Sequence, residues 1–186
     1  EQQQEETATT SAPVLYVKIA LNGCPNVLSR FKLETFLTNE ADMQPVDHPM
    51  LLAPGKFFYW VFVGERGTFS KTHVDVMGSE AWLVVVSGRK EWVMVHPHDK
   101  HLVMDGEGKF ANLFDIDYAR FPQAHRARIT RFEQGPGDAI FVPSDAPHAV
   151  RNLEQSVSFT YNFFGTTSDS ASKWQRMVGR VMGDNS

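Results

Sequence analysis

The chain has 186 residues, 42% of them hydrophobic and 12% aromatic, which predicts one globular domain with a substantial core. Its formal net charge of −4 argues against broad binding of nucleic acid, because such binding needs a basic face. The single cysteine, Cys24, excludes an internal disulfide and fits an intracellular location, in the cytoplasm or nucleus. The longest apolar run is far shorter than the ~20 residues that span a membrane, so no membrane association is expected.

The first third of the chain mixes one predicted strand with polar and irregular sequence. Residues 1–13 are polar and of low complexity, and we predict a disordered tail there. Residues 14–21 alternate well enough to form a strand. Ser29 is a suitable N-cap for a short helix that ends near Asn39. Residues 40–56 contain three prolines and a glycine and predict a loop.

From residue 57 onward the sequence consists mainly of short β-type runs separated by glycine-rich turns. Eight such runs indicate an all-β core with a few flanking helices, namely a double-stranded β-helix (jelly roll, cupin-like) over about residues 57–164. Residues 97–123 break this pattern and predict a long insertion with short helical pieces. The eight runs are residues 57–64, 70–76, 81–86, 90–96, 127–133, 139–142, 148–153 and 156–164.

The end of the chain has helical rather than strand periodicity. Five apolar residues fall on one stripe of a predicted amphipathic helix over about residues 170–183, which Gly183 is positioned to stop. Packing of this helix on its own barrel is the simpler interpretation, and it makes residues 14–186 a single domain. The alternative is that the helix forms a homodimer. The five residues are Trp174, Met177, Val178, Val181 and Met182.

Two separated segments offer metal-binding side chains. His73 and Asp75 stand in an H-x-D sequence, and His148 lies near the end of the predicted barrel. Two imidazoles and one carboxylate are the 2-His-1-carboxylate set that holds non-haem Fe(II) with open coordination positions. On an extended segment His73 and Asp75 point to the same face, because strand side chains alternate. His148 follows an apolar strand, and we expect it to arrive from the opposite sheet of the jelly roll.

Lys90 and Thr160 are the next candidates for a binding site. Period two places Lys90 on the same side of its strand as Trp92, whereas Glu91 points away. A lysine on an apolar face is costly unless it meets an anion, and snorkelling at the strand end is the alternative. In residues 156–162 small polar side chains alternate with bulky apolar ones. The face that includes Thr160 therefore lines either solvent or a ligand cavity.

A second group of histidines lies in the sequence His96-Pro97-His98-Asp99-Lys100-His101. These residues could form another metal site, or they could be a polar exit from a strand into the insertion. The second interpretation is favoured, because Pro97 interrupts regular ligand spacing and no further ligand is indicated nearby.

Five blocks of sequence occur in order along the predicted barrel. They are Thr72-His73-Val74-Asp75, Gly78-Ser79-Glu80-Ala81-Trp82, Gly88-Arg89-Lys90-Glu91-Trp92, Gly137-Asp138-Ala139-Ile140-Phe141-Val142-Pro143 and His148-Ala149-Val150-Arg151-Asn152-Leu153. In these blocks the chain resembles the JmjC-domain Fe(II)/2-oxoglutarate-dependent oxygenases. It is most similar to the small protein hydroxylases among them, including the phosphatidylserine-receptor-like JmjC proteins. The resemblance covers roughly residues 57–164.

The resemblance implies a site and an activity. His73, Asp75 and His148 would be the catalytic Fe(II) ligands. Lys90, Thr160 and Ser70 would bind the cosubstrate 2-oxoglutarate, with Lys90 as the charge-assisted partner of its distal carboxylate. The enzyme would be a dioxygenase that uses O2 to hydroxylate or demethylate a protein or peptide side chain, with release of succinate and CO2.

Two positions depart from the family pattern. Residues 144–147 replace a frequent Gly-Trp step before the last iron ligand, and Leu83 stands near a position that is often Asn. Two other functions stay open at this point: another metal-dependent cupin enzyme, and a non-catalytic JmjC-like binding module. The first gives no reason for an inward-facing Lys90, and the intact triad together with Lys90 argues against the second.

Overall fold

The computed structural model describes residues 15–21 and 59–163. Several predictions fall outside these ranges and stay predictions. They are the tail of residues 1–13, the helix after Ser29, the loop of residues 40–56 and the helix of residues 170–183. Among the residues described, no helix is both long enough and apolar enough to cross a bilayer.

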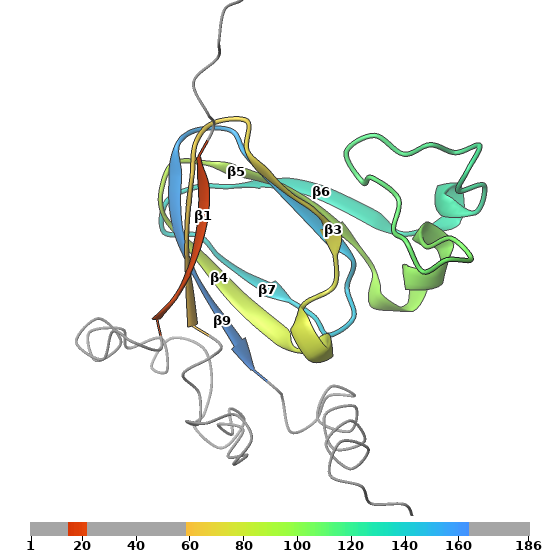
Figure 1. The fold of residues 1–186 in the computed structure, drawn as a ribbon, viewed down its shortest axis with the longest axis horizontal. Coiled ribbons are helices and arrows are strands. Elements are labelled where there is room, and N and C mark those ends of the chain that lie inside the picture. Colours follow the sequence, from red (N-terminus) through yellow and green to blue (C-terminus); the bar gives the residue numbers. More distant parts are fainter. Residues whose placement is uncertain (1–14, 22–58, 164–186) are drawn as a thin grey trace, which may run out of the picture.

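The described residues form two antiparallel sheets that face each other (Figure 1). One sheet has the strand order β1-β2-β9-β4-β7 and the other β3-β8-β5-β6, and every neighbouring pair is antiparallel. This arrangement confirms the predicted jelly-roll core. The strands are β1 (Tyr16–Ala20), β2 (Tyr59–Gly64), β3 (Phe69–His73), β4 (Glu80–Ser87), β5 (Lys90–Val95), β6 (Ile129–Gln134), β7 (Ala139–Val142), β8 (His148–Asn152) and β9 (Ser156–Phe163).

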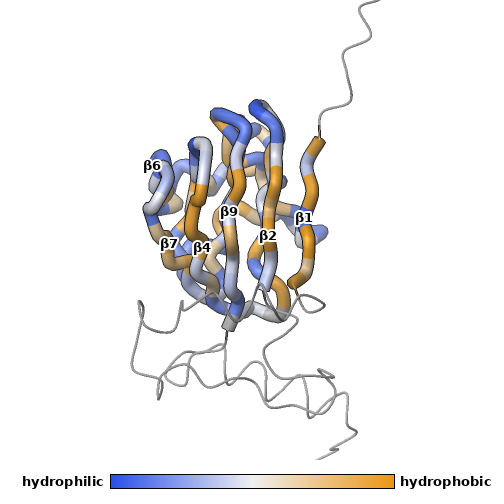
Figure 2. Tube along the Cα trace, turned by 90° about the vertical axis from the view of Figure 1, so that its left-hand side faces the viewer, coloured by the Kyte–Doolittle hydropathy of each residue, from blue (hydrophilic) through white to orange (hydrophobic). Residues whose placement is uncertain are grey.

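The first hydrophobic core lies between the two sheets, and its composition follows from strand alternation. In β4, alternate residues Ala81, Leu83 and Val85 are buried, as period two requires. They pack against Trp92 of β5 and Val150 of β8, across the barrel interior. Figure 2 shows the five-stranded sheet face-on, with apolar segments in each of its strands.

A second core lies on the outer side of the four-stranded sheet, under the insertion between β5 and β6. The insertion begins with the short 3-10 helix η5 (Pro97–Val103), which confirms a helical piece within predicted residues 97–123. A second short 3-10 helix, η6 (Ala124–Arg126), follows directly after the predicted end of the insertion. Val93, Val95 and Ala149 face it from β5 and β8. Because β5 is covered on both faces, it is apolar along most of its length.

The insertion is also tied to the strand that carries His73. The backbone N–H of Leu113 donates to the hydroxyl of Thr72 on β3, at 3.2 Å. Leu113 is itself part of the outer core and is 2% exposed. The insertion therefore supports β3 from outside the barrel.

Candidate metal centre

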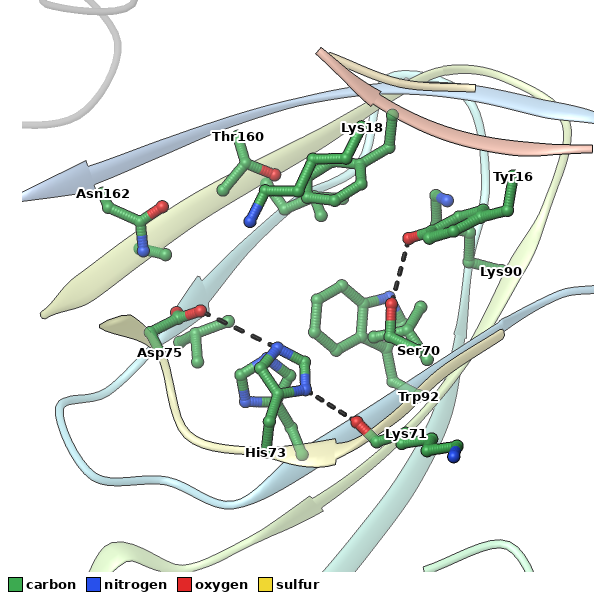
Figure 3. Close-up of a pocket in the computed structure, with 16 residues that line it drawn as sticks. Tyr16, Lys18, Ser70, Lys71, His73, Asp75, Lys90, Trp92, Thr160 and Asn162 are labelled. Carbon is green, nitrogen blue, oxygen red and sulfur yellow. Dashed lines mark hydrogen bonds and ion pairs between the residues drawn. The ribbon is translucent and has the colours of Figure 1, made fainter. Parts of the chain in front are cut away.

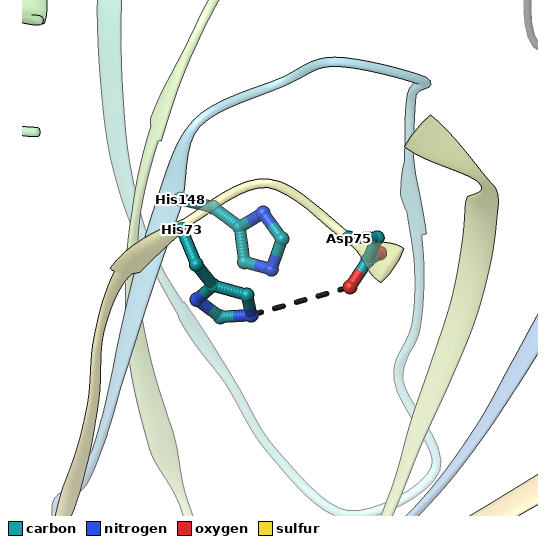
Figure 4. A group of neighbouring side chains, drawn as sticks. All are labelled: His73, Asp75 and His148. Atoms are coloured by element: carbon teal, nitrogen blue, oxygen red, sulfur yellow. Dashed lines mark ion pairs between the residues drawn. The ribbon is translucent and has the colours of Figure 1, made fainter. Parts of the chain in front are cut away.

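His73, Asp75 and His148 converge in the structure (Figure 4). The two histidines are direct cross-strand partners, and their ring centroids are 4.3 Å apart. An Asp75 carboxylate oxygen lies 4.0 Å from Nε2 of His73. One ligand atom from each of the three residues lies within 4.8 Å of the others. This donor set fits a divalent transition metal held by two imidazoles and one carboxylate.

The route by which His148 reaches this centre differs from the prediction. The apolar strand before it, β7, ends at Val142 and belongs to the five-stranded sheet. The chain then crosses to the other sheet, where His148 begins β8 beside β3. The expectation that His148 arrives from the opposite sheet was wrong, because the crossing takes place in the loop before it.

Asp75 also lies in a different setting from the one expected. The strand β3 ends at His73, so Asp75 is not a strand residue. Its backbone is still extended, with φ −62° and ψ 155°, and it precedes the 3-10 helix η4 (Val76–Gly78). This helix carries the chain from β3 to β4 in the facing sheet. Asp75 therefore lies at the junction of the two sheets.

Backbone carbonyls fix the orientation of both imidazoles. Nδ1 of His73 lies 2.8 Å from the carbonyl oxygen of Lys71, and Nδ1 of His148 lies 3.0 Å from that of Ala146. Because a carbonyl only accepts, each Nδ1 carries the proton and each Nε2 keeps a free lone pair. Burial is the main influence on the pKa of the His148 imidazole and lowers it, which favours the neutral form that binds metals.

The loop before His148 is joined to the segment after Asp75. Ser144 donates its hydroxyl hydrogen to the carbonyl oxygen of Gly78, at 2.6 Å. The N–H of Gly78 in turn donates to the carbonyl oxygen of Asp75, at 3.0 Å. Ser144 lies where the family often has a Gly-Trp step, and here it holds together the two loops that carry metal-binding candidates.

A pocket of about 310 Å³ opens at this centre, between the two sheets (Figure 3). All six predicted site residues line this pocket. They are Ser70, His73, Asp75, Lys90, His148 and Thr160.

A β-bulge explains how Ser70 and His73 both reach the pocket. They are three residues apart, and a regular strand would point them to opposite faces. In the register, Ser70 is opposite Val150 and His73 is opposite His148, so β3 has one more residue than β8 between these pairs. The extra residue shifts the alternation and returns His73 to the interior.

Lys90 lies deep in the barrel, where it is 2% exposed. Its ammonium donates to Oδ1 of Asn152 at 2.7 Å, and no carboxylate of the described residues pairs with it. Burial lowers its pKa from 10.5 to about 8. The neighbouring Glu91 points outward and pairs with Arg131 and Arg151, as period two predicted. Snorkelling is therefore excluded, and the pocket contains a buried cation.

This burial makes the stability of the metal-free protein depend on pH. Between about pH 8 and 10.5 the unfolded chain binds more protons at Lys90 than the folded one, so the free energy of unfolding rises with pH. Below pH 8 the buried charge costs on the order of 3 kcal/mol. We therefore expect Lys90→Met to be more stable than wild type at neutral pH, by a margin that narrows as pH increases. Urea unfolding at several pH values measures this margin, and a constant margin would contradict the assignment.

The polar residues of β9 face the interior rather than solvent. Ser156, Ser158, Thr160 and Asn162 are all at most 8% exposed, so the solvent-facing alternative is wrong. The Thr160 hydroxyl oxygen is buried without a hydrogen-bond partner among the residues described. An unpartnered hydroxyl and a buried cation in one pocket fit an anionic ligand that satisfies both.

Two pocket residues from β1 were missed by the sequence reasoning. Tyr16 and Lys18 both point from β1 into the pocket (Figure 3). The hydroxyls of Tyr16 and Ser70 are 3.0 Å apart and hydrogen-bonded, and the Lys18 ammonium lies 4.0 Å from the ring centroid of Trp60. The alternation of residues 14–21 places Tyr16 and Lys18 on one face, and this was the available signal.

The histidines of residues 96–101 lie where the chain leaves β5 for the insertion, which agrees with the favoured interpretation of a polar exit from this strand. Nδ1 of His96 accepts from the backbone N–H of His98 at 3.3 Å. Asp99 accepts from the backbone N–H, Nε and Nη2 of Arg128, and these hydrogen bonds hold its pKa below the usual range. Its carboxylate is thus occupied by an ion pair.

Comparison with known proteins identifies the family. A family model described as a cupin-like domain matches residues 3–169. The arginine-specific demethylase JMJ20 of Arabidopsis thaliana is 33% identical over 109 residues, 57% of this chain and 24% of that protein. The 2-oxoglutarate and iron-dependent oxygenase JMJD4 of Mus musculus is 30% identical over 113 residues, 57% of this chain and 26% of that protein. The bifunctional arginine demethylase and lysyl-hydroxylase psr-1 of Caenorhabditis elegans is 30% identical over 120 residues, 56% of this chain and 29% of that protein.

The chain spans about a quarter of the length of these curated relatives. The cupin-like model, in contrast, covers most of this chain, and the fold agrees with it. The resemblance found in the five sequence blocks is confirmed. The chain belongs to the cupin-like domain family, and the relatives that it resembles are named as iron- and 2-oxoglutarate-dependent oxygenases or arginine demethylases.

Proposed function

We propose that this chain is an Fe(II)- and 2-oxoglutarate-dependent dioxygenase that hydroxylates or demethylates a side chain of a protein, with release of succinate and CO2. One observation carries the proposal. A 2-His-1-carboxylate centre and the buried ammonium of Lys90 line the same pocket. A metal-chelating ligand with a distal carboxylate satisfies both features at once, and 2-oxoglutarate has this structure.

The metal-binding roles follow from the donor atoms. His73 and His148 would offer Nε2 lone pairs, since their Nδ1 atoms are hydrogen-bonded to backbone carbonyls, and Asp75 would offer a carboxylate oxygen. Three protein ligands leave coordination positions open for a cosubstrate. When bound, Fe(II) with 2-oxoglutarate and O2 supplies the oxidising power for attack on a C–H bond.

The cosubstrate roles follow from the polar end of the pocket. Lys90 would pair with the distal carboxylate, in a charge-assisted hydrogen bond that replaces lost hydration. Thr160 has a buried hydroxyl free to donate, and Ser70 would donate or accept together with Tyr16. Leu83 and Val142 form apolar walls, which keep water away from the reacting atoms.

The substrate class is inferred from the names of the relatives. Two are named as arginine demethylases and one of these also as a lysyl-hydroxylase, which supports a protein or peptide side chain as the substrate here. An intracellular location and a homodimer through the helix of residues 170–183 remain parts of the proposal. Sedimentation of the full chain against a variant with Met177 and Val181 changed to Glu tests the dimer.

Stepwise anaerobic loading tests the activity. We expect a visible charge-transfer band that needs both Fe(II) and 2-oxoglutarate, and that is absent in His73→Ala. Admission of O2 should then yield succinate, and a screen of peptides should reveal a product one oxygen heavier or one methyl group lighter. Iron binding with no response to 2-oxoglutarate would instead favour another metal-dependent cupin enzyme.

A further inference from the structure

The ammonium of Lys90 is held by a neutral partner, the side chain of Asn152. The two residues are cross-strand partners on β5 and β8, and Lys90 Nζ donates to Asn152 Oδ1 at 2.7 Å. Asn152 is 2% exposed and does not line the pocket, so it acts from behind the lysine. A buried lysine is more often paired with a carboxylate, and the choice of an amide here needs an explanation.

The hydrogen bonds around Asn152 define which end of its amide faces Lys90. An ammonium only donates, so the amide oxygen must face it. The Ser156 hydroxyl donates to the same oxygen, at 2.6 Å. The amide nitrogen donates to Thr68 Oγ1 at 2.7 Å, and this hydroxyl in turn donates to the carbonyl of Glu65 at 2.6 Å. Each donor in this hydrogen-bonded series, from Lys90 to Glu65, meets an acceptor, so a single orientation of the Asn152 amide satisfies all of these groups.

The backbone fixes Asn152 as firmly as its side chain does. Its N–H donates to the carbonyl of Thr68, and its own carbonyl accepts from the N–H of Gly67, both at 2.8 Å. The amide also packs against Gly64, where any Cβ would collide with Asn152 Nδ2. The glycine at position 64 thus makes room for this side chain, and Asn152 has little freedom to move.

We infer that Asn152 is a positioning residue that fixes the Lys90 ammonium at the base of the pocket without neutralising it, and thereby makes the site selective for 2-oxo acids with a distal carboxylate. The inference rests on the proposed function, because it concerns the same cosubstrate. A carboxylate at position 152 would form an internal ion pair with Lys90. The distal carboxylate of the cosubstrate would then meet a neutral pair and a second negative charge instead of a free cation.

Binding measurements with a redox-inert metal test this inference without any turnover. The Mn(II)-loaded chain is titrated calorimetrically with 2-oxoglutarate and with 2-oxopentanoate, which has the same carbon chain but no distal carboxylate. We expect wild type to prefer 2-oxoglutarate. Asn152→Asp should lose roughly 10- to 100-fold in affinity for 2-oxoglutarate and change by less than about twofold toward 2-oxopentanoate.

Two further variants keep the test decisive. Asn112→Asp makes the same change at an exposed position of the insertion, and it should leave both affinities unchanged. Asn152→Ser keeps the site neutral but shortens the side chain, so it should reduce the preference for 2-oxoglutarate less than Asn152→Asp does. It also serves as the test if Asn152→Asp does not fold.

The possible failures are distinguishable. If wild type binds neither 2-oxo acid, the proposed function fails. If wild type prefers 2-oxoglutarate and Asn152→Asp keeps that preference, the inference on Asn152 is wrong while the function stands. An equal loss of affinity for both 2-oxo acids in a folded Asn152 variant would also overturn the inference, because that result indicates a structural role.

Discussion

His148→Ala is expected to lose metal binding and turnover together. Losses of about 10- to 100-fold in metal affinity are typical when only an outer-shell partner is removed, and His148 would be a direct ligand. Its ring is 4% exposed, and it also stacks on Trp92, with centroids 5.7 Å apart. A direct ligand contributes more to metal affinity than an outer-shell partner does, so the loss should exceed 100-fold.

The measurement for His148→Ala is Fe(II) or Mn(II) affinity, together with succinate formation. His125→Ala is the matched control, because His125 is exposed on η6 and lies outside the pocket. It should behave as wild type. If a folded His148→Ala protein kept wild-type metal affinity, His148 would not be a metal ligand. The proposed iron centre, and with it the proposed iron-dependent activity, would then be wrong.

Lys90→Met is expected to weaken 2-oxoglutarate binding by about 100-fold while stabilising the metal-free protein at neutral pH. The first effect follows from loss of the charge-assisted hydrogen bonds to the distal carboxylate. The second follows because Met has similar length and no charge to desolvate, and replacing buried charge by apolar volume often adds about 1–4 kcal/mol of stability. Asn152 Oδ1 still accepts from Ser156 in this variant.

Calorimetric titration and urea unfolding of the same preparation measure the two effects of Lys90→Met. Lys109→Met is the control, since Lys109 is exposed and pairs with Glu107 on the insertion. Metal affinity should be unchanged in both variants. Undiminished 2-oxoglutarate affinity in Lys90→Met would mean that another cation, such as Lys18, binds the distal carboxylate.

The strands could be predicted from sequence because their signal is local. Alternation and turn residues define β4, β7 and β9 to within one residue at each end. The predicted run of residues 70–76 extended too far, since β3 ends at His73. The chain must turn there to reach the facing sheet, and that requirement comes from topology. No local pattern in the sequence reports it.

The site was predictable in its members but not in its geometry. His73, Asp75 and His148 were found from residue types and from resemblance, which need no coordinates. The bulge that brings Ser70 and His73 to one face depends on the pairing of β3 with β8, which periodicity in one segment does not reveal. The same holds for Asn152, because its contact with Lys90 joins residues 62 positions apart.

The extra residue of β3 couples the bulge to the number of residues between Ser70 and His73. With the present spacing of three, a β3 strand without the bulge would direct either the hydroxyl or the imidazole out of the barrel. Deleting Lys71 would reduce the spacing to two, and a regular strand would then direct both side chains inward without a bulge. Evolution or protein engineering can therefore change the length of this segment only together with its bulge, whichever amino acids occupy the two positions.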